Sequence, residues 1–310
     1  MKKVQKNDAL QIQKRFHLFR LVLEKKVKDE PSIADSVANR ADVLEHLLTK
    51  APRFVDENGT IYQASRTFKI DDSGFYFKFG VEKKSPEKKF DEKKYDFVDF
   101  EGSKTQYAYC FYCPKNQLLA VERKSKFYAP SIIANKIALT LEGMKNNPKY
   151  HLDNNENLLF LSSVCKSRIV YRPTEFITEI KQAKILLSFT VSIPIQNPYD
   201  FENMLADPMK KYMDEVNASE SKVTVANKEG LATDKLVDMS HKMAAYGAGA
   251  SAIVKQSAES KEKKVSLNSQ KNSAVAECKL DKGTTIEQNK ESIFKRILEV
   301  FKAIHDGHKE

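Results

Sequence analysis

One short stretch carries a carboxylate and a cation at the spacing found in metal-dependent nucleases. Glu122 and Lys124 are separated by one residue at the end of an apolar segment. In a nuclease core, an acidic residue and an Asp/Glu-x-Lys pair on adjoining strands hold Mg²⁺ and polarise the attacking water. Asp96 or Asp99 could supply the second carboxylate only if the strands align them with Glu122. A nuclease or other toxic effector with Glu122 and Lys124 as catalytic residues is therefore the alternative interpretation.

Cys110 and Cys113 have the spacing of half a zinc site or of a redox pair. A structural zinc ion needs four ligands, and the other two cysteines, Cys165 and Cys278, are isolated. The aromatic neighbours of Cys110 are typical of a strand, whereas thiols are activated at the start of a helix. We therefore expect packed strand cysteines, and the sequence predicts no metal ion and no cofactor.

The histidines and glycines form no catalytic signature. None of the six histidines lies in a known catalytic motif, and we expect His241 to be half-buried on a helix. Residues 246–250, Tyr-Gly-Ala-Gly-Ala, have the composition of a phosphate-binding loop. Such loops open a helix, so that its N-terminus meets the anion, but these glycines follow a helical segment. We expect Gly247 to end that helix.

The basic segments indicate a polyanionic partner. Residues 83–94 hold six lysines against three acidic residues, in what we expect to be a loop between two strands, and residues 122–128 place three cations beside two aromatic residues. Lysines follow phosphates without reading bases, so binding should be sequence-independent and steeply salt-dependent. The candidate nucleic-acid-binding residues are Lys83, Lys84, Lys88, Lys89, Arg123, Lys124 and Lys126.

Two other interpretations of these lysines stay open. A lysine-rich loop can be a solvated segment that keeps a basic protein soluble. The basic face can also meet an acidic partner protein, which would make the chain a protein-interaction adaptor.

The elements that position these residues fall into two groups. Between Gly59 and Arg123, short segments rich in Tyr, Phe, Ile and Val alternate with turns, which predicts an antiparallel meander or an open barrel. A strand is expected within Leu10–Val27, with a helix as the alternative, and helices are expected after Pro31 and over residues 129–146.

After residue 180 the pattern predicts a smaller α+β sandwich with the order β-α-β-α-β-β-α. The expected strands are Lys184–Ile193, Lys222–Ala226, Ala250–Gln256, Lys264–Leu267 and Ala274–Leu280, and the expected helices are Tyr199–Val216, Leu231–Tyr246 and Thr284–His305. The predicted fold class is α+β, with a β-rich N-terminal domain over 1–180 that carries the basic loop and a C-terminal domain over 181–310.

Composition sets the broad class of protein. The 310 residues include 52 Lys and Arg against 42 Asp and Glu, a net charge of +10, with 41% hydrophobic residues, as in a globular basic protein. No apolar run approaches the ~20 residues of a membrane helix, so we expect no membrane insertion. The N-terminus has no signal-like apolar stretch, and four scattered cysteines favour a reducing cytoplasm.

Three phrases of the sequence, in this order, resemble a bacterial family from phage-defence islands that is similar in layout to the A component of the lambda Rex exclusion system. The phrases are Leu118–Phe127, Ile185–Pro194 followed by Asn197–Phe201, and Lys222–Leu231 followed by Met243–Gly249. The resemblance implies a two-domain, homodimeric, cytoplasmic DNA-binding protein that acts in abortive infection. As the partner we expect a double-stranded nucleic acid, with DNA favoured over RNA. A partner protein encoded in the same operon would fit a role in abortive infection. Residues 83–94 match no part of the family.

Overall fold

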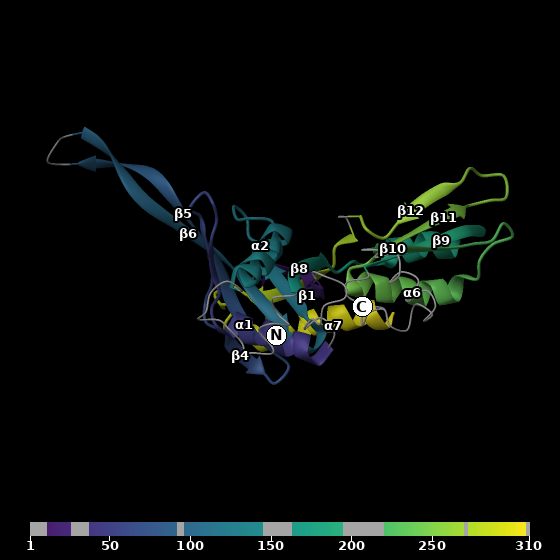
Figure 1. Ribbon diagram of the computed structural model, residues 1–310, viewed down its shortest axis with the longest axis horizontal. Coiled ribbons are helices and arrows are strands. Elements are labelled where there is room, and N and C mark those ends of the chain that lie inside the picture. The colour runs from purple at the N-terminus through teal and green to yellow at the C-terminus, as the bar shows by residue number, and fades with distance from the viewer. Residues whose placement is uncertain are drawn as a thin grey trace, which may run out of the picture. The chain divides into compact units, whose positions relative to one another are not determined.

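The computed structural model describes residues 11–25, 37–91, 96–144, 163–194, 220–269 and 272–307, which Figure 1 shows as coloured ribbons. For residues 83–91 and 96–104 only the backbone is described.

A large antiparallel sheet of nine strands dominates the N-terminal part of the fold. Its order is β13-β1-β7-β6-β5-β3-β2, with β4 paired to β5 and β8 paired to β1, so the path of described strands stays open and forms no closed barrel. The strands are β1 (Gln11–Lys25), β2 (Arg53–Val55), β3 (Ile61–Ala64), β4 (Phe68–Asp71), β5 (Gly74–Asp91), β6 (Asp96–Cys113), β7 (Leu118–Glu122), β8 (Ser163–Ile169) and β13 (Val275–Asp281).

The central strands of this sheet bury one face more deeply than the other, because alternate residues of a strand point to opposite sides. Phe77, Phe79 and Ala108 have no exposed surface. Helix α2 (Pro130–Gly143) contacts β2, β3 and β7 with Ile133 and its neighbours, while α1 (Val37–Thr49) contacts the short turn η2 (Pro114–Asn116).

A second antiparallel sheet has four strands in the order β10-β9-β11-β12. Helix α4 packs against α6, β11 and β12, and α6 packs against β11 and the last helix, α7. The bounds are α4 (Thr174–Gln182), β9 (Ile185–Pro194), β10 (Glu220–Ala226), α6 (Thr233–Tyr246), β11 (Gly249–Lys255), β12 (Lys263–Ser266) and α7 (Lys290–Asp306). On β11, alternate residues including Ala250 and Val254 are buried, as expected for a sheet with helices on one face.

The α+β fold class is confirmed, but one strand belongs to a different sheet from the one expected. The strand predicted at Ala274–Leu280 forms as β13, and it pairs with β1 in the large sheet rather than joining the C-terminal sandwich. The register runs from Gln11 opposite Asp281 to His17 opposite Val275. An alternating pattern predicts a half-buried strand and cannot tell which sheet edge will receive it. The helix predicted at Tyr199–Val216 lies outside the described residues.

The prediction of a lysine-rich loop at residues 83–94 is wrong, because residues 83–91 lie within β5 and continue its pairing with β6. β6 is likewise continuous from Asp96 to Cys113, through the turn-like residues Glu101, Gly102 and Ser103. In the described chain, residues 83–91 and 96–104 pair only with each other, and we call this two-stranded extension the ribbon. Figure 1 shows β5 and β6 running on together past their neighbours. At ~3.3 Å per residue, the ribbon is about 30 Å long.

The chain forms two compact units that are discontinuous in sequence. One unit takes the residues up to Leu18, Ile169–Phe189 and Val225 onward, and the other takes Phe19–Arg168 and Thr190–Thr224. The division into one domain over residues 1–180 and another over residues 181–310 therefore stays a prediction. Among the described helices, none is long and apolar enough to cross a membrane.

Candidate nucleic-acid interface

The predicted basic residues lie at the ribbon and just beyond β7. Arg123 and Lys126 are exposed, while Lys124 is half-buried and turns back over the sheet. Lys83, Lys84, Lys88 and Lys89 lie on the backbone of the ribbon, where side-chain positions are not described.

The register of β5 and β6 builds the surface beneath Lys124. Lys78 lies opposite Tyr109, Gly80 opposite Tyr107, and Glu82 opposite Thr105. Directly opposed residues share a face of an antiparallel sheet. The residues that alternate with them, such as Phe77 and Phe79, point to the buried face. The pairing therefore gathers cations and tyrosines on the face away from α2.

Two lysine ammonium groups converge on two tyrosine rings. The Lys124 Nζ atom is 4.0 Å from the centroid of the Tyr107 ring and 5.5 Å from that of Tyr109. The Lys78 Nζ atom is 5.2 Å from both centroids. These distances are those of cation–π contacts, which hold the lysines over the rings. We call Lys78, Tyr107, Tyr109, Glu122 and Lys124 the basic–aromatic cluster.

Glu122 is the buried member of this cluster, with 1% of its surface exposed. Its Oε2 atom accepts a hydrogen bond from the backbone N–H of Tyr109 at 3.3 Å and lies 3.7 Å from the Lys124 Nζ atom. A buried carboxylate needs such partners, since burial without them costs several kcal/mol, ~3–5 when one member of a pair is removed. The arrangement gives Glu122 a structural role in fixing Lys124 beside β6.

The pairing does not supply the second carboxylate that a nuclease site requires. Asp99 is ten residues from Tyr109 on the continuous strand β6, a distance of about 33 Å, and Asp96 is farther still. In the described part of the chain, no three His, Cys, Asp or Glu side chains are grouped so that they could hold a metal ion. The strands therefore do not align Asp96 or Asp99 with Glu122, as a nuclease site that includes Lys124 would require.

The cysteines and His241 take the positions expected for packed residues. All four cysteines are buried free thiols, and burial raises the pKa of Cys110 far above its ordinary value. His241 is half-buried on α6, and its Nδ1 atom lies 2.9 Å from the Ile304 carbonyl oxygen. Gly247 ends α6 with φ 67°, as a helix-terminating glycine does.

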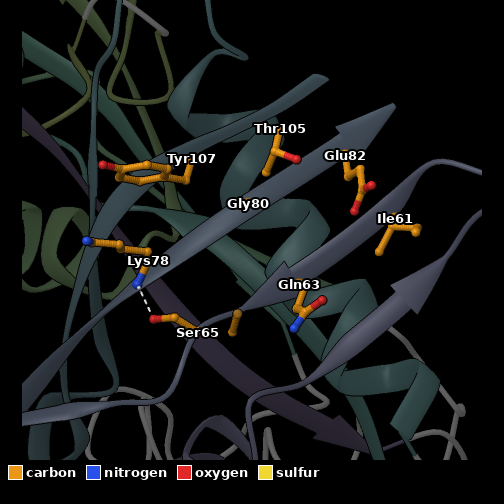
Figure 2. Close-up of a pocket in the computed structure, with 9 residues that line it drawn as sticks. Ile61, Gln63, Ser65, Lys78, Gly80, Glu82, Thr105 and Tyr107 are labelled. Carbon is orange, nitrogen blue, oxygen red and sulfur yellow. Dashed lines mark hydrogen bonds between the residues drawn. The ribbon is translucent and has the colours of Figure 1, made fainter. Parts of the chain in front are cut away.

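A groove of about 200 Å³ runs along β5 beside the basic–aromatic cluster. Figure 2 shows its floor at Gly80, where β5 carries no side chain, with Thr105 and Tyr107 on one side and Ile61 and Gln63 on the other. The full lining is Ile61, Gln63, Ala64, Ser65, Lys78, Gly80, Glu82, Thr105 and Tyr107.

The ribbon itself is almost neutral, contrary to the lysine excess of residues 83–94. Residues 83–104 contain seven lysines and six acidic residues, because β6 adds Asp96, Asp99 and Glu101. The register places Lys88 opposite Asp99. The cations that contact aromatic rings on the groove face include Lys78 and Lys124, at the base of the ribbon, and Arg66, which lies over the Phe68 ring.

Sequence reasoning identified Lys124 but missed Lys78 and Tyr107. A single lysine inside the apolar run Phe75–Phe79 was the available signal, because it marks the face of β5 that is not core. Only the register shows that this face meets the tyrosines of β6.

A scan of the chain against models of protein families finds no match, and a search of curated proteins finds none either. The resemblance to the phage-exclusion family therefore depends on the three phrases alone and stays a prediction.

Proposed function

We propose that this protein binds nucleic acid, in the first place double-stranded DNA, through contacts to the phosphate backbone. The observation that carries the proposal is the convergence of the Lys78 and Lys124 ammonium groups on Tyr107 and Tyr109 at the base of the ribbon. The rings hold the cations in place on the sheet, so a phosphate meets charges that are already positioned.

The ribbon provides the shape that suits a duplex. A two-stranded β-ribbon fits the major groove of B-DNA, and its length of about 30 Å approaches one helical turn of about 34 Å. Since the ribbon is almost neutral, the electrostatic attraction comes from the cations at its base, including the exposed Arg123 and Lys126.

Charge-removing variants with a matched control test the proposal. In Lys78→Gln and Lys124→Gln, affinity for a random-sequence duplex should fall, and the slope of log K against log salt should become shallower by about one for each phosphate that is no longer neutralised. Lys136→Gln is the control, because the Lys136 Nζ atom lies 4.4 Å from the Tyr62 ring on the face that contacts α2. Fluorescence polarisation at several salt concentrations gives both quantities. No binding by the wild-type chain, or an equal effect of all three variants, would contradict the proposal.

The proposed cellular role is that of a sensor or effector in phage defence, acting in the cytoplasm as a homodimer, with an operon-encoded partner as an additional component. The resemblance to the exclusion family supports this role. Phage plating on cells that express the wild-type chain should be reduced, and the Lys78→Gln, Lys124→Gln double variant should restore it. Light scattering tests the homodimer.

A protein-interaction adaptor is the second candidate, favoured by the near balance of charges on the ribbon and by its outer edges, which pair with no other described strand. Free strand edges can accept an added strand from a partner protein. A gel-shift assay with unrelated duplexes at low salt separates the two candidates, because an adaptor should produce no shift.

A further inference from the structure

We infer that the groove over Gly80 is a binding site for one unpaired nucleobase, with guanine preferred over thymine. The inference depends on the proposed function, because it names the part of a nucleic acid that this surface takes beyond the phosphate backbone.

The shape of the groove suits a planar ring attached to a phosphate. Gly80 leaves the middle of β5 without a side chain, and the volume of about 200 Å³ above it holds a heterocycle. Lys78 and Glu82 stand at the two ends of the groove, four residues apart on β5 and hence about 13 Å from each other. A base between them can keep its own phosphate near the Lys78 ammonium.

The walls offer the contacts by which proteins hold unstacked bases. Tyr107 is 38% exposed although its ring is held by Lys124, and an exposed tyrosine on a sheet is a common stacking platform for single strands. Across the groove, the Gln63 amide can donate and accept hydrogen bonds, and Thr105 adds a hydroxyl group beside Tyr107.

Glu82 gives the site its preference among bases. An ionised carboxylate only accepts hydrogen bonds. Guanine presents neighbouring N–H donors at N1 and N2, which one carboxylate can accept together. Thymine presents one N–H between two carbonyl oxygens, which the carboxylate repels. A strand containing guanine should therefore bind more tightly than one made of thymine alone.

Filling the groove provides the decisive variant. A Cβ atom built on Gly80 would lie 3.5 Å from the Gln106 carbonyl oxygen and 3.8 Å from the Tyr107 Cβ atom, which are ordinary contact distances. The φ angle of Gly80 is not in the left-handed region. Gly80→Ala and Gly80→Val should therefore fold, and valine also has a high preference for strands. The valine side chain occupies the floor of the groove without changing any charge.

The experiment compares three end-labelled probes by fluorescence polarisation: an oligothymidine, the same strand with one central guanine, and a duplex. The wild-type chain should bind the guanine-containing strand about fivefold or more tightly than the all-thymine strand. Gly80→Val should remove that difference and leave affinity for the duplex unchanged. Glu82→Gln should bring the two single strands to similar affinities, because an amide both donates and accepts.

The outcomes separate this inference from the proposed function. If the wild-type chain binds none of the probes, the proposed function itself is wrong. If it binds the duplex but shows no guanine preference, or if Gly80→Val keeps the preference, only the base site is wrong. Thermal unfolding tests whether Gly80→Ala and Gly80→Val are folded. A loss of guanine preference that grows from alanine to valine is the result expected for a filled site.

Discussion

At the scale of single residues, the basic–aromatic cluster depends on a buried carboxylate. Glu122 joins the backbone of β6 to Lys124 through a hydrogen bond and an ion pair. A residue of this kind can be mistaken for a catalytic acid, because Glu-x-Lys at the end of a strand also occurs in nucleases. Stability and binding measurements distinguish the two roles.

Glu122→Gln should lower the free energy of unfolding by about 1–3 kcal/mol, because the Tyr109 N–H loses a charged acceptor and Lys124 loses its partner. Affinity for DNA should be retained, because the Tyr107 and Tyr109 rings still hold Lys124 and a negative charge is removed beside it. Urea denaturation and fluorescence polarisation measure these effects. Loss of a Mg²⁺-dependent cleavage activity in this variant, with stability unchanged, would favour the nuclease interpretation instead.

The buried thiols should be unreactive in the native protein. Burial raises the pKa of Cys278 to about 11 and that of Cys110 still further, so at about pH 8 the thiol of Cys278 is almost entirely protonated. We expect no alkylation by iodoacetamide in buffer and complete alkylation in denaturant, measured by mass spectrometry. Rapid alkylation of Cys110 in the folded chain would show that β6 opens at that point.

His241 should make stability depend on pH below neutrality. Burial lowers the pKa of His241 in the folded chain below its ordinary value of 6.5. As the pH falls through about 6.5, the unfolded chain binds a proton before the folded chain does, so the unfolding free energy falls. In His241→Gln this part of the pH dependence should disappear. Urea denaturation of both proteins between about pH 7.5 and pH 5 tests the prediction, and identical pH profiles would exclude it.

At the scale of elements, the ribbon extends β5 and β6 beyond the residues that pair with β3 and β7. In the described chain, residues 83–91 and 96–104 pair only with each other, and β3 and β7 pair with other parts of β5 and β6. Stability of the sheet and function of the ribbon can therefore be tested separately.

Replacing residues 84–103 by a short Asn-Gly turn, which such hairpins accept, should leave a folded protein. The melting temperature should move by less than about 4 °C, because only pairs within the ribbon are removed. Affinity for a duplex should fall if the ribbon lies in a groove of DNA, and guanine preference should persist because the Gly80 groove is intact. Unfolding of this variant would show that the ribbon also supports the sheet.

At the scale of the whole molecule, the C-terminal part of the sequence supplies a strand to the N-terminal sheet. β13 pairs with β1 along seven residue pairs, so a cut at residue 180 separates two strands of one sheet. A fragment of residues 1–180 should therefore be poorly soluble or lack cooperative unfolding, because β1 loses this neighbour. Coexpression with residues 181–310 should restore a soluble complex, as size-exclusion chromatography would show. A fragment 1–180 that unfolds cooperatively by itself would support the boundary predicted near residue 180.

Helices and strands could be predicted from the sequence where apolar residues recur at a regular helical or strand spacing. α2, α6 and β11 lie where their apolar spacing placed them, to within a few residues at their ends, and β1 lies within the expected segment Leu10–Val27. α7 begins at Lys290, six residues after the expected start at Thr284. The ribbon was not predicted from the sequence, because its lysines, Pro86 and Gly102 are residues that are common in turns. They are recognised as strand residues only when the pairing of β5 with β6 is known. The short strand β8 and helix α4 were also not predicted from the sequence.

By itself, the sequence determined the α+β class, the excess of cations and the segments able to form strands, because these depend on composition and on short-range periodicity. Only the tertiary structure decided that Lys78 faces Tyr109 and that Gly80 opens a groove beside Tyr107. Register between strands depends on contacts between residues far apart in the chain, and a shift of one residue would turn these side chains to the opposite face. The candidate site is therefore a property of the pairing of β5, β6 and β7 rather than of any one segment.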